Sequence, residues 1–430
     1  MSITIVGNSA AAVGAIEAIR AYDADVPIHV ITAEGPAIYS RPLISHYVAG
    51  DIDRQRLAYR GSSFYEDHGV DTVFHEPVTA IDPEGHTVTT NAGRVVSYDK
   101  LLLAVGGSPI VPPMPGLDLE GVTTFASLED AQAIESLLKQ GRARHAVVVG
   151  GGMIGIKATD ALTKRGIRVT MVELAPRILI RALDDESAAM MTRLFGRAGV
   201  RVLTENTVAE IIPDNGHIAG VVLQDGQRLD CDLLVFGIGV RPNVTLARDA
   251  GLEVNRGLVV DRGMRTSDPD IYAAGDVAEA YDLVVDLNRT VAIWPNAYRQ
   301  GAIAGAQMLG QPREDHGGIP MNAIEVAGVP CVAIGSGNAE GDGYDVLTRG
   351  TAADGSRGQP QYRRLVLEGN RLVGVILVGN ISRAGIYTGL IRHRVDISAH
   401  RDSLLSDRLS LLSVPEDYRK HVVRGESIEV

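Results

Sequence analysis

Short apolar runs that end in small residues recur along this chain, and apolar positions at helical spacing follow several of them. Residues 3–6 (ITIV) form the first run and residues 145–149 (HAVVV) form a second. Continuous apolar runs of this length are typical of strands buried in a parallel sheet. The pattern therefore predicts an α/β fold built from strand–turn–helix units.

The clearest unit starts at residue 145 and reads HAVVVGGGMIGIKATDALTKRGIRVTMVE. Gly150, Gly152 and Gly155 take the three glycine positions of a GxGxxG turn. The first glycine allows a tight turn, the second lets the backbone approach a pyrophosphate, and the third lets helix and strand pack closely. The helix should end near Gly166, and a second strand over 167–172 should follow. We therefore expect a dinucleotide site here.

An acidic residue, Glu173, ends that second strand. Its carboxylate can accept hydrogen bonds from both hydroxyls of a ribose, and it would repel a 2′-phosphate. The next arginine is Arg177. The sequence therefore favours NAD(H) over NADP(H).

The N-terminal stretch over 4–19, TIVGNSAAAVGAIEAI, has the same rhythm with different residues. Ser9 stands where the second glycine belongs and Ala12 where the third belongs. A strand over 28–31 follows the helical pattern, and the nearest acid, Glu34, lies beyond the strand end. Taken alone, the stretch is either a second phosphate-binding turn or an alanine-rich helix start.

Three more apolar runs end in glycine turns: LLLAVGGSP (101–109), DLLVFGIGVRPN (232–243) and TSDPDIYAAGDVAEA (266–280). The last ends in Gly275-Asp276, where a carboxylate can hold the ribityl hydroxyls of a flavin. In this order the motifs resemble the pyridine nucleotide–disulfide oxidoreductase superfamily, whose members have two dinucleotide-binding domains. The resemblance covers nearly the whole chain and favours the first of the two readings of residues 4–19.

The resemblance implies an FAD site, an NAD(H) site and a C-terminal α+β interface domain. For FAD it implies thirteen residues: Gly7, Ser9, Ala10, Ala12, Glu34, Arg41, Pro42, Val78, Ala104, Gly106, Asp276, Trp294 and Pro295. For NAD(H) it implies six: Gly150, Gly152, Ile154, Gly155, Glu173 and Gly239. Trp294 is expected near the isoalloxazine ring, and a plain core indole is the alternative.

The segment YSRPLISHYVAG (39–50) indicates the branch of the superfamily. Disulfide reductases carry a cysteine pair here, whereas this chain has no cysteine before Cys231. The segment resembles that of rubredoxin and ferredoxin reductases and of the flavoprotein part of assimilatory nitrite reductases. A thiol relay beside the flavin is therefore excluded.

One pair of residues departs from this pattern. Many relatives pair a lysine near the flavin with a glutamate on the helix after the NAD turn, and here His46 and Lys157 stand at these positions. Both are candidates for the pocket, and His46 is equally well explained as a structural histidine. Asp160, one turn beyond Lys157, is a candidate for the missing carboxylate.

The composition of the chain limits the classes of ligand and partner that we expect. The formal net charge of −12 argues against a nucleic-acid or anionic-membrane binder. Cys231 and Cys331 each lie in an apolar run, which is typical of buried thiols, and no cysteine cluster is present for an iron–sulfur centre or another metal. No leader pattern and no apolar run long enough to span a membrane is evident, so we expect a cytoplasmic protein. The oligomeric state stays open, a homodimer being one alternative.

We expect three domains. Residues 1–112 and 244–316 would form a discontinuous FAD domain, 113–243 the NAD domain and 317–430 the interface domain, with a hairpin turn at Gly369-Asn370 and a mixed-charge tail from Tyr418.

The expected activity is transfer of electrons from NADH through FAD to a rubredoxin- or ferredoxin-type iron–sulfur protein, in either direction. No side chain is required as an acid or base, so no catalytic residue is assigned. One alternative is an NADH oxidase or a reductase of quinones or small oxidants. Another is a flavin-binding, non-catalytic or sensor subunit of a larger complex.

Overall fold

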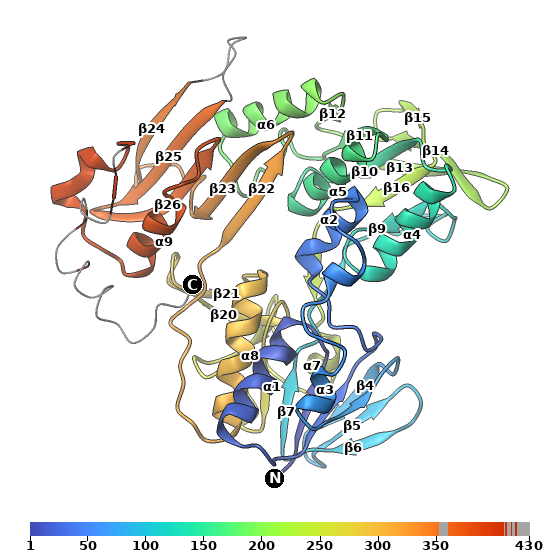
Figure 1. The fold of residues 1–430 in the computed structure, drawn as a ribbon, viewed down its shortest axis with the longest axis vertical. Helices are drawn as coiled ribbons and strands as arrows, with labels where there is room; N and C mark the ends of the chain where they lie inside the picture. Colours follow the sequence, from blue (N-terminus) through green and yellow to red (C-terminus); the bar gives the residue numbers. More distant parts are fainter. Residues whose placement is uncertain (352–359, 408, 411–413, 415–417, 419–430) are drawn as a thin grey trace. The chain divides into compact units, whose positions relative to one another are not determined.

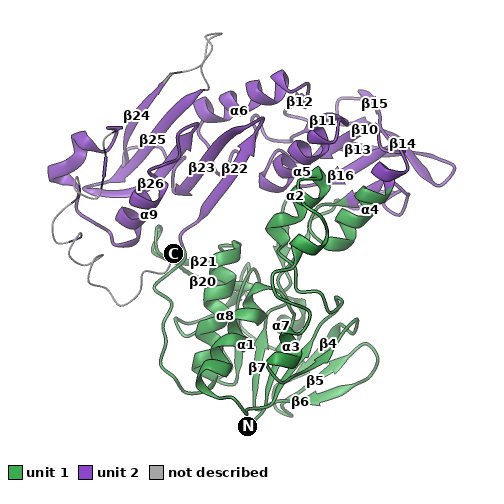
Figure 2. Cartoon of the chain, viewed as in Figure 1, with its two compact units in different colours: residues 1–112, 124–136, 239–318 green, residues 113–123, 137–238, 319–430 purple. Residues whose placement is uncertain are grey.

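The computed structural model describes residues 1–351, 360–407, 409–410, 414 and 418 (Figure 1). The mixed-charge tail after Tyr418 therefore lies outside the described residues. The chain divides into two compact units (Figure 2). Unit 1 comprises residues 1–112, 124–136 and 239–318, and unit 2 comprises residues 113–123, 137–238 and 319–430.

Unit 1 is built on a five-stranded parallel sheet. Its strands, in sheet order, are β19 (Ile271–Ala273), β7 (Lys100–Leu103), β1 (Ile3–Val6), β2 (Ile28–Ile31) and β3 (Val70–Val73). Strand β1 lies at the centre of the sheet, between β7 and β2. This is the arrangement in which a crevice opens at the carboxyl ends of the strands, where dinucleotides bind.

Two helices of unit 1, α1 (Ala10–Tyr22) and α8 (Trp294–Met308), pack against each other at unusually close range. Glycines make this approach feasible. A Cβ placed on Gly301 would lie 1.9 Å from the carbonyl oxygen of Ala11, and one on Gly14 would lie 2.2 Å from that of Tyr298. The helix that connects β1 with β2 is thereby packed against a helix almost 300 residues later in the sequence.

Replacing Gly301 with valine should therefore separate the two helices. We expect a loss of about 3 kcal/mol in the free energy of unfolding, at the upper end of the cost of overpacking, because the clash is with backbone. Thermal unfolding of the flavin-free protein measures it. Gly196→Ala is the control: its Cβ would meet nothing within 4 Å, so the variant should be as stable as the parent or more stable. An unchanged melting temperature for Gly301→Val would contradict the packing.

Unit 1 contains further strands and helices besides this sheet and these two helices. The additional strands are β4 (Val78–Asp82), β5 (Thr87–Thr90), β6 (Val95–Ser97), β8 (Gly107–Pro109), β17 (Val240–Pro242), β18 (Leu258–Val259), β20 (Ala278–Asp282) and β21 (Leu287–Arg289). The additional helices are η1 (Arg41–Leu43), α2 (Ile44–Ala49), η2 (Gln55–Leu57), α3 (Phe64–Asp67) and α7 (Thr245–Asp249), together with most of α4 (Leu128–Lys139). Antiparallel β8 and β17 pair where the chain leaves and re-enters the unit.

Unit 2 contains a second sheet with the same central arrangement. Its strand order is β12 (Arg201–Leu203), β11 (Arg168–Val172), β10 (His145–Val149), β16 (Leu233–Phe236) and β9 (Val122–Thr124). Helices α5 (Met153–Lys164) and α6 (Asp185–Arg197) connect its strands, and an antiparallel sheet of β13 (Val208–Asp214), β14 (His217–Leu223) and β15 (Arg228–Asp230) accompanies it. The predicted helix end is confirmed, because α5 stops two residues before Gly166, which has φ +77°.

The C-terminal part of unit 2 is an antiparallel sheet. It consists of β22 (Met321–Val326), β23 (Val329–Gly335), β26 (Arg371–Val378), β25 (Gln361–Glu368) and β24 (Asp345–Thr351), followed by α9 (Ala384–Arg392) and η3 (Ser398–Ser403). The hairpin turn at Gly369-Asn370 is confirmed. Helices α5 and α6 both contact β22, so the second parallel sheet and this domain form one compact unit. The α/β fold class with an additional C-terminal α+β domain is confirmed.

Candidate functional site

The first candidate turn follows β1 in unit 1. Gly7 has φ +113°, and a Cβ on it would lie 2.2 Å from the carbonyl oxygen of Ala104, the residue after β7. Only glycine fits this backbone and this approach. Ser9 is the N-cap of α1 but makes no capping hydrogen bond with its side chain. The first N–H groups of α1 are thus left to a ligand or to water, as a phosphate-binding helix start requires.

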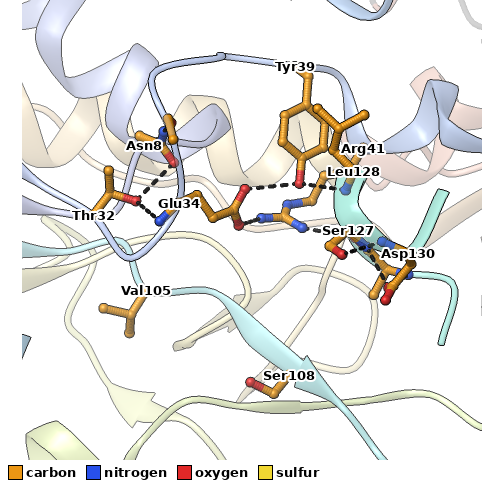
Figure 3. Close-up of polar contacts among 12 residues, drawn as sticks. Asn8, Thr32, Glu34, Tyr39, Arg41, Val105, Ser108, Ser127, Leu128 and Asp130 are labelled. Atoms are coloured by element: carbon orange, nitrogen blue, oxygen red, sulfur yellow. Dashed lines mark hydrogen bonds and ion pairs between the residues drawn. The ribbon is translucent and has the colours of Figure 1, made fainter. Parts of the chain in front are cut away.

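A network of hydrogen bonds holds the loop that carries Glu34 (Figure 3). The Thr32 hydroxyl donates to Asn8 Oδ1 at 3.2 Å and accepts from the Glu34 N–H at 3.1 Å. The Asn8 amide donates to the Gly35 carbonyl oxygen at 3.0 Å. Asn8 lies in the candidate turn itself, so this network connects the turn with the acid. Sequence reasoning missed Asn8 and Thr32, because neither belongs to the glycine pattern.

The Glu34 carboxylate forms two contacts with the following segment (Figure 3). It accepts a hydrogen bond from the Tyr39 hydroxyl at 3.0 Å and forms an ion pair with Arg41. Arg41 also donates to the Ala126 carbonyl oxygen at 2.9 Å, just before α4. Burial raises the pKa of Tyr39 to about 12, so this phenol stays protonated near neutral pH. Arg41 and Glu34 are therefore brought together, with Tyr39 as a partner that sequence reasoning did not assign.

Asp276 lies three residues after β19, at the same edge of the sheet. Its carboxylate makes no hydrogen bond and no ion pair with any residue that the structure describes, although it is partly buried. Burial raises its pKa, and the positive charge of Arg41 opposes the rise. A buried carboxylate without a partner is costly. The site therefore fits a group that brings hydroxyl donors, as the ribityl chain of FAD would.

The remaining residues expected at the FAD site also lie in unit 1. Ala104 is buried after β7, and Gly106 has φ +62° in the turn before β8. Val78 begins β4 and is half-buried, whereas Pro42 is exposed in η1. Ala10 and Ala12 are buried on α1.

Trp294 and Pro295 begin α8. The Trp294 indole meets the Tyr59 ring edge to face, with ring centroids 5.1 Å apart, and packs against the core. Pro295 is exposed at the helix start, where a proline costs no hydrogen bond. Both the flavin-facing and the core interpretation of Trp294 are compatible with this position.

The second candidate turn follows β10 in unit 2. Gly150 has φ +108°, and a Cβ on Gly155 would lie 1.8 Å from the Gly150 carbonyl oxygen. A Cβ on Gly152, by contrast, would meet nothing within 4 Å. Gly152 is the N-cap of α5, with no side-chain cap. The three glycines therefore have different roles, as expected. Gly150 and Gly155 allow the backbone to take up this conformation, whereas Gly152 leaves open space in front of the helix start. Ile154 lies in the first turn of α5.

Glu173 directly follows β11 and faces this turn. Its carboxylate accepts hydrogen bonds from the N–H groups of Gly151 and of Ala175, the latter at 2.7 Å. Arg177, the next cation, contacts Asp185 at 2.6 Å and donates to the Leu183 carbonyl oxygen at 2.6 Å. Arg177 is therefore engaged elsewhere. Gly239, the sixth expected NAD(H) residue, lies in unit 1 with φ +121°.

His46 and Lys157 have different surroundings. His46 lies on α2, half exposed, with its Nδ1 3.2 Å from an oxygen of Asp51. Lys157 lies on α5 without an ion-pair partner among the described residues, and burial lowers its pKa. Asp160, considered above as a substitute carboxylate, instead pairs with Lys164 at 3.1 Å.

Neither cysteine is suited to redox exchange. Cys231 and Cys331 are buried and unpaired, and burial raises the pKa of each thiol to about 12. A thiol with so high a pKa is a poor nucleophile. Within the described ranges, no group of histidine, cysteine or acidic side chains is arranged to hold a metal ion. None of the helices there is both long and apolar enough to cross a bilayer.

Comparisons with known proteins agree with this geometry. The NADH-dependent phenylglyoxylate dehydrogenase subunit epsilon of Aromatoleum evansii is 30% identical, over 95% of each chain. The ferredoxin–NAD(+) reductase component of the biphenyl dioxygenase system of Paraburkholderia xenovorans is 32% identical, over 93% of this chain and 95% of that one. The solved covalent complex of putidaredoxin reductase with putidaredoxin superposes with a TM-score of 0.83 and 28% identity, over 98% of each chain.

Several other relatives are longer: the chain spans half or less of the length of three nitrite reductases that it matches (48%, 44% and 38%). Residues 320–395 match the rubredoxin NAD+ reductase C-terminal domain. Residues 1–301 match the pyridine nucleotide-disulphide oxidoreductase family, whose members bind FAD and NAD(H), and the chain therefore belongs to that family of oxidoreductases.

Proposed function

We propose that this protein oxidises NADH with a bound FAD and passes the electrons to an iron–sulfur protein. The observation that carries the proposal is the pair of glycine turns, each at the carboxyl edge of a parallel sheet and each followed by a helix without a side-chain cap. When bound, FAD accepts two electrons as a hydride and releases them singly.

The residues of unit 1 would each hold one part of FAD. The N–H groups at the start of α1 would bind the pyrophosphate, and Glu34 would accept hydrogen bonds from the adenosine ribose after exchanging its present partners. Arg41 would neutralise phosphate charge, and Asp276 would hold the ribityl hydroxyls. In unit 2, the N–H groups at the start of α5 would bind the pyrophosphate of NADH, and Glu173 would accept hydrogen bonds from its adenosine ribose.

The proposed acceptor is a ferredoxin- or rubredoxin-type protein. Two facts support it: the only cysteines are buried, so electrons must leave the flavin without a thiol relay, and a relative that matches over nearly its full length is a ferredoxin–NAD(+) reductase component. The match to a dehydrogenase subunit supports a second candidate, in which the chain performs the same NADH chemistry as one subunit of a larger enzyme.

Stopped-flow reoxidation tests the acceptor. The protein is reduced anaerobically with one equivalent of NADH and mixed with a ferredoxin, a rubredoxin, a quinone or oxygen. The proposal predicts that reoxidation is fastest with an iron–sulfur protein. Faster reoxidation by oxygen or quinone would favour an oxidase or quinone reductase. A reduced flavin that no acceptor reoxidises would favour a subunit that functions only in its complex.

The nucleotide preference depends on Glu173. We expect Glu173→Ala to lower the ratio of kcat/KM for NADH to that for NADPH by about 10-fold, the effect of losing ~1.4 kcal/mol of discrimination. Glu186→Ala, on the exposed surface of α6, is the matched control and should leave the ratio unchanged. A parent protein that prefers NADPH, or a variant with the parent's ratio, would refute the role of Glu173.

The domain organisation and location belong to the same proposal. We retain an FAD domain of residues 1–112 and 244–316, an NAD domain of 113–243 and an interface domain of 317–430. We also propose a cytoplasmic location, because buried unpaired thiols suit a reducing compartment.

A further inference from the structure

The amino edge of the sheet in unit 2 carries a cluster of arginines that the proposed function does not use. His145, Arg168 and Arg201 are the first residues of β10, β11 and β12. The dinucleotide turn follows Val149, the last residue of β10, at the opposite edge. Five residues of strand separate the two edges by about 13–16 Å. The cluster is thus distinct from the expected NAD(H) site.

Strand register places these side chains on one face of the sheet. His145 pairs with Arg168, and Thr170 pairs with Arg201. Because side chains alternate between faces along a strand, Arg168 and Thr170 point the same way. The 3.2 Å contact between His145 Nε2 and Thr170 Oγ1 confirms that they share a face. The arginines therefore converge across adjacent strands.

This face borders a cavity of about 770 Å³ that is wide open to solvent. Arg144, just before β10, and Arg228, the first residue of β15, complete a set of four lining arginines. None of the four forms an ion pair with a residue that the structure describes. By comparison Arg142, which lies nearby outside this cavity, is paired with Glu120 at 2.5 Å.

The three aspartates that line the cavity do not cancel the positive charge of its four arginines. Asp214, Asp230 and Asp232 also line it, one fewer than the arginines. Asp232 accepts hydrogen bonds from the backbone N–H groups of Arg144 and His145, at 2.8 and 3.0 Å. In a chain with a net charge of −12, the cavity is a local positive site.

We propose that this cavity binds a small anion with more than one phosphate group. Guanidinium groups offer paired N–H donors that match phosphate oxygens, and several on neighbouring strands match several phosphates. The volume is that of a small-molecule site, too small for a protein domain. Such a ligand would bind to unit 2 independently of the dinucleotides.

Calorimetric titration with pyrophosphate tests the proposal. The holoprotein is used, with FAD bound and NAD+ at saturation, so that both dinucleotide sites are occupied. We expect saturable binding of one pyrophosphate per chain, and at least 10-fold weaker binding by the double variant Arg168→Gln/Arg201→Gln. Arg193→Gln, a half-exposed arginine on α6, is the matched control and should bind within two-fold of the parent.

Three results would overturn the proposal: no binding, equal binding by the double variant, or binding of citrate but not pyrophosphate, which would indicate a carboxylate site. Because the exchanged arginines are exposed, both variants should keep the parent's melting temperature and flavin content. If the parent protein fails to bind FAD, the proposed function fails, and the same titration without dinucleotides still tests the arginine site through the double variant.

Discussion

Replacing Asp276 with alanine is expected to weaken FAD binding about 10- to 100-fold. The loss corresponds to one charge-assisted hydrogen bond, worth ~1.5–3 kcal/mol. The physical reason is that this partly buried carboxylate has no hydrogen-bond or ion-pair partner among the described residues, so the ligand would supply one. Flavin retained after gel filtration and the dissociation constant from fluorescence titration measure the effect.

The stability of the flavin-free protein provides a control, because removing the Asp276 charge should increase this stability while it weakens FAD binding. Burial raises the pKa of Asp276 in the folded state, so folding is penalised once the pH exceeds the pKa of the unfolded chain. The flavin-free parent should therefore lose stability as the pH rises from about 4, until the folded-state pKa is passed. Asp276→Asn removes the charge and should therefore raise the melting temperature of the flavin-free protein at pH 7. If the Asp276→Ala variant bound FAD as tightly as the parent does, Asp276 would not be a ligand residue.

Replacing either of two glycines in the second turn should weaken NADH binding, in two distinguishable ways. A side chain at Gly155 collides with the Gly150 carbonyl oxygen, so Gly155→Val should displace α5 and lower both stability and NADH affinity. A side chain at Gly152 collides with no protein atom, so Gly152→Val should keep the melting temperature but occupy the space expected for the pyrophosphate. We expect each to weaken NADH binding about 100-fold, or ~2.7 kcal/mol.

Titration of the holoprotein with NADH, followed by the change in flavin absorbance, measures the affinity, and thermal unfolding measures the stability. Flavin content should stay at the parent's level in both variants, because both glycines belong to unit 2 and the expected FAD residues to unit 1. If Gly152→Val bound NADH as the parent does, the dinucleotide would have to lie elsewhere.

The local pattern predicted much of the fold. Strands β1, β2 and β10 begin and end where their apolar runs do, because a continuous run bounded by small residues leaves little alternative. Gly7 and Gly155 could be recognised in the sequence as turn residues, because a side chain at either position would collide with the backbone. The C-terminal hairpin was predicted from its Gly369-Asn370 turn for the same reason.

Contacts between distant segments could not be predicted in this way. The close crossing of α1 and α8 depends on glycines that read as ordinary helix positions in the sequence. The hydrogen bonds of Asn8, Thr32 and Tyr39 around Glu34 follow from tertiary packing and from no periodic pattern. Asp160 was considered a partner for Lys157, but it pairs instead with Lys164, one turn further along α5.

The central claim is that electrons pass from NADH to FAD and onward without a thiol, and the reductive capacity of the protein tests it most directly. Anaerobic titration of the yellow holoprotein with NADH should bleach the flavin completely at one equivalent per chain, with the same endpoint after treatment with a thiol-alkylating reagent. An endpoint of two equivalents, or one altered by alkylation, would reveal a second two-electron centre. Either result, or a chain that takes up no FAD, would contradict the account.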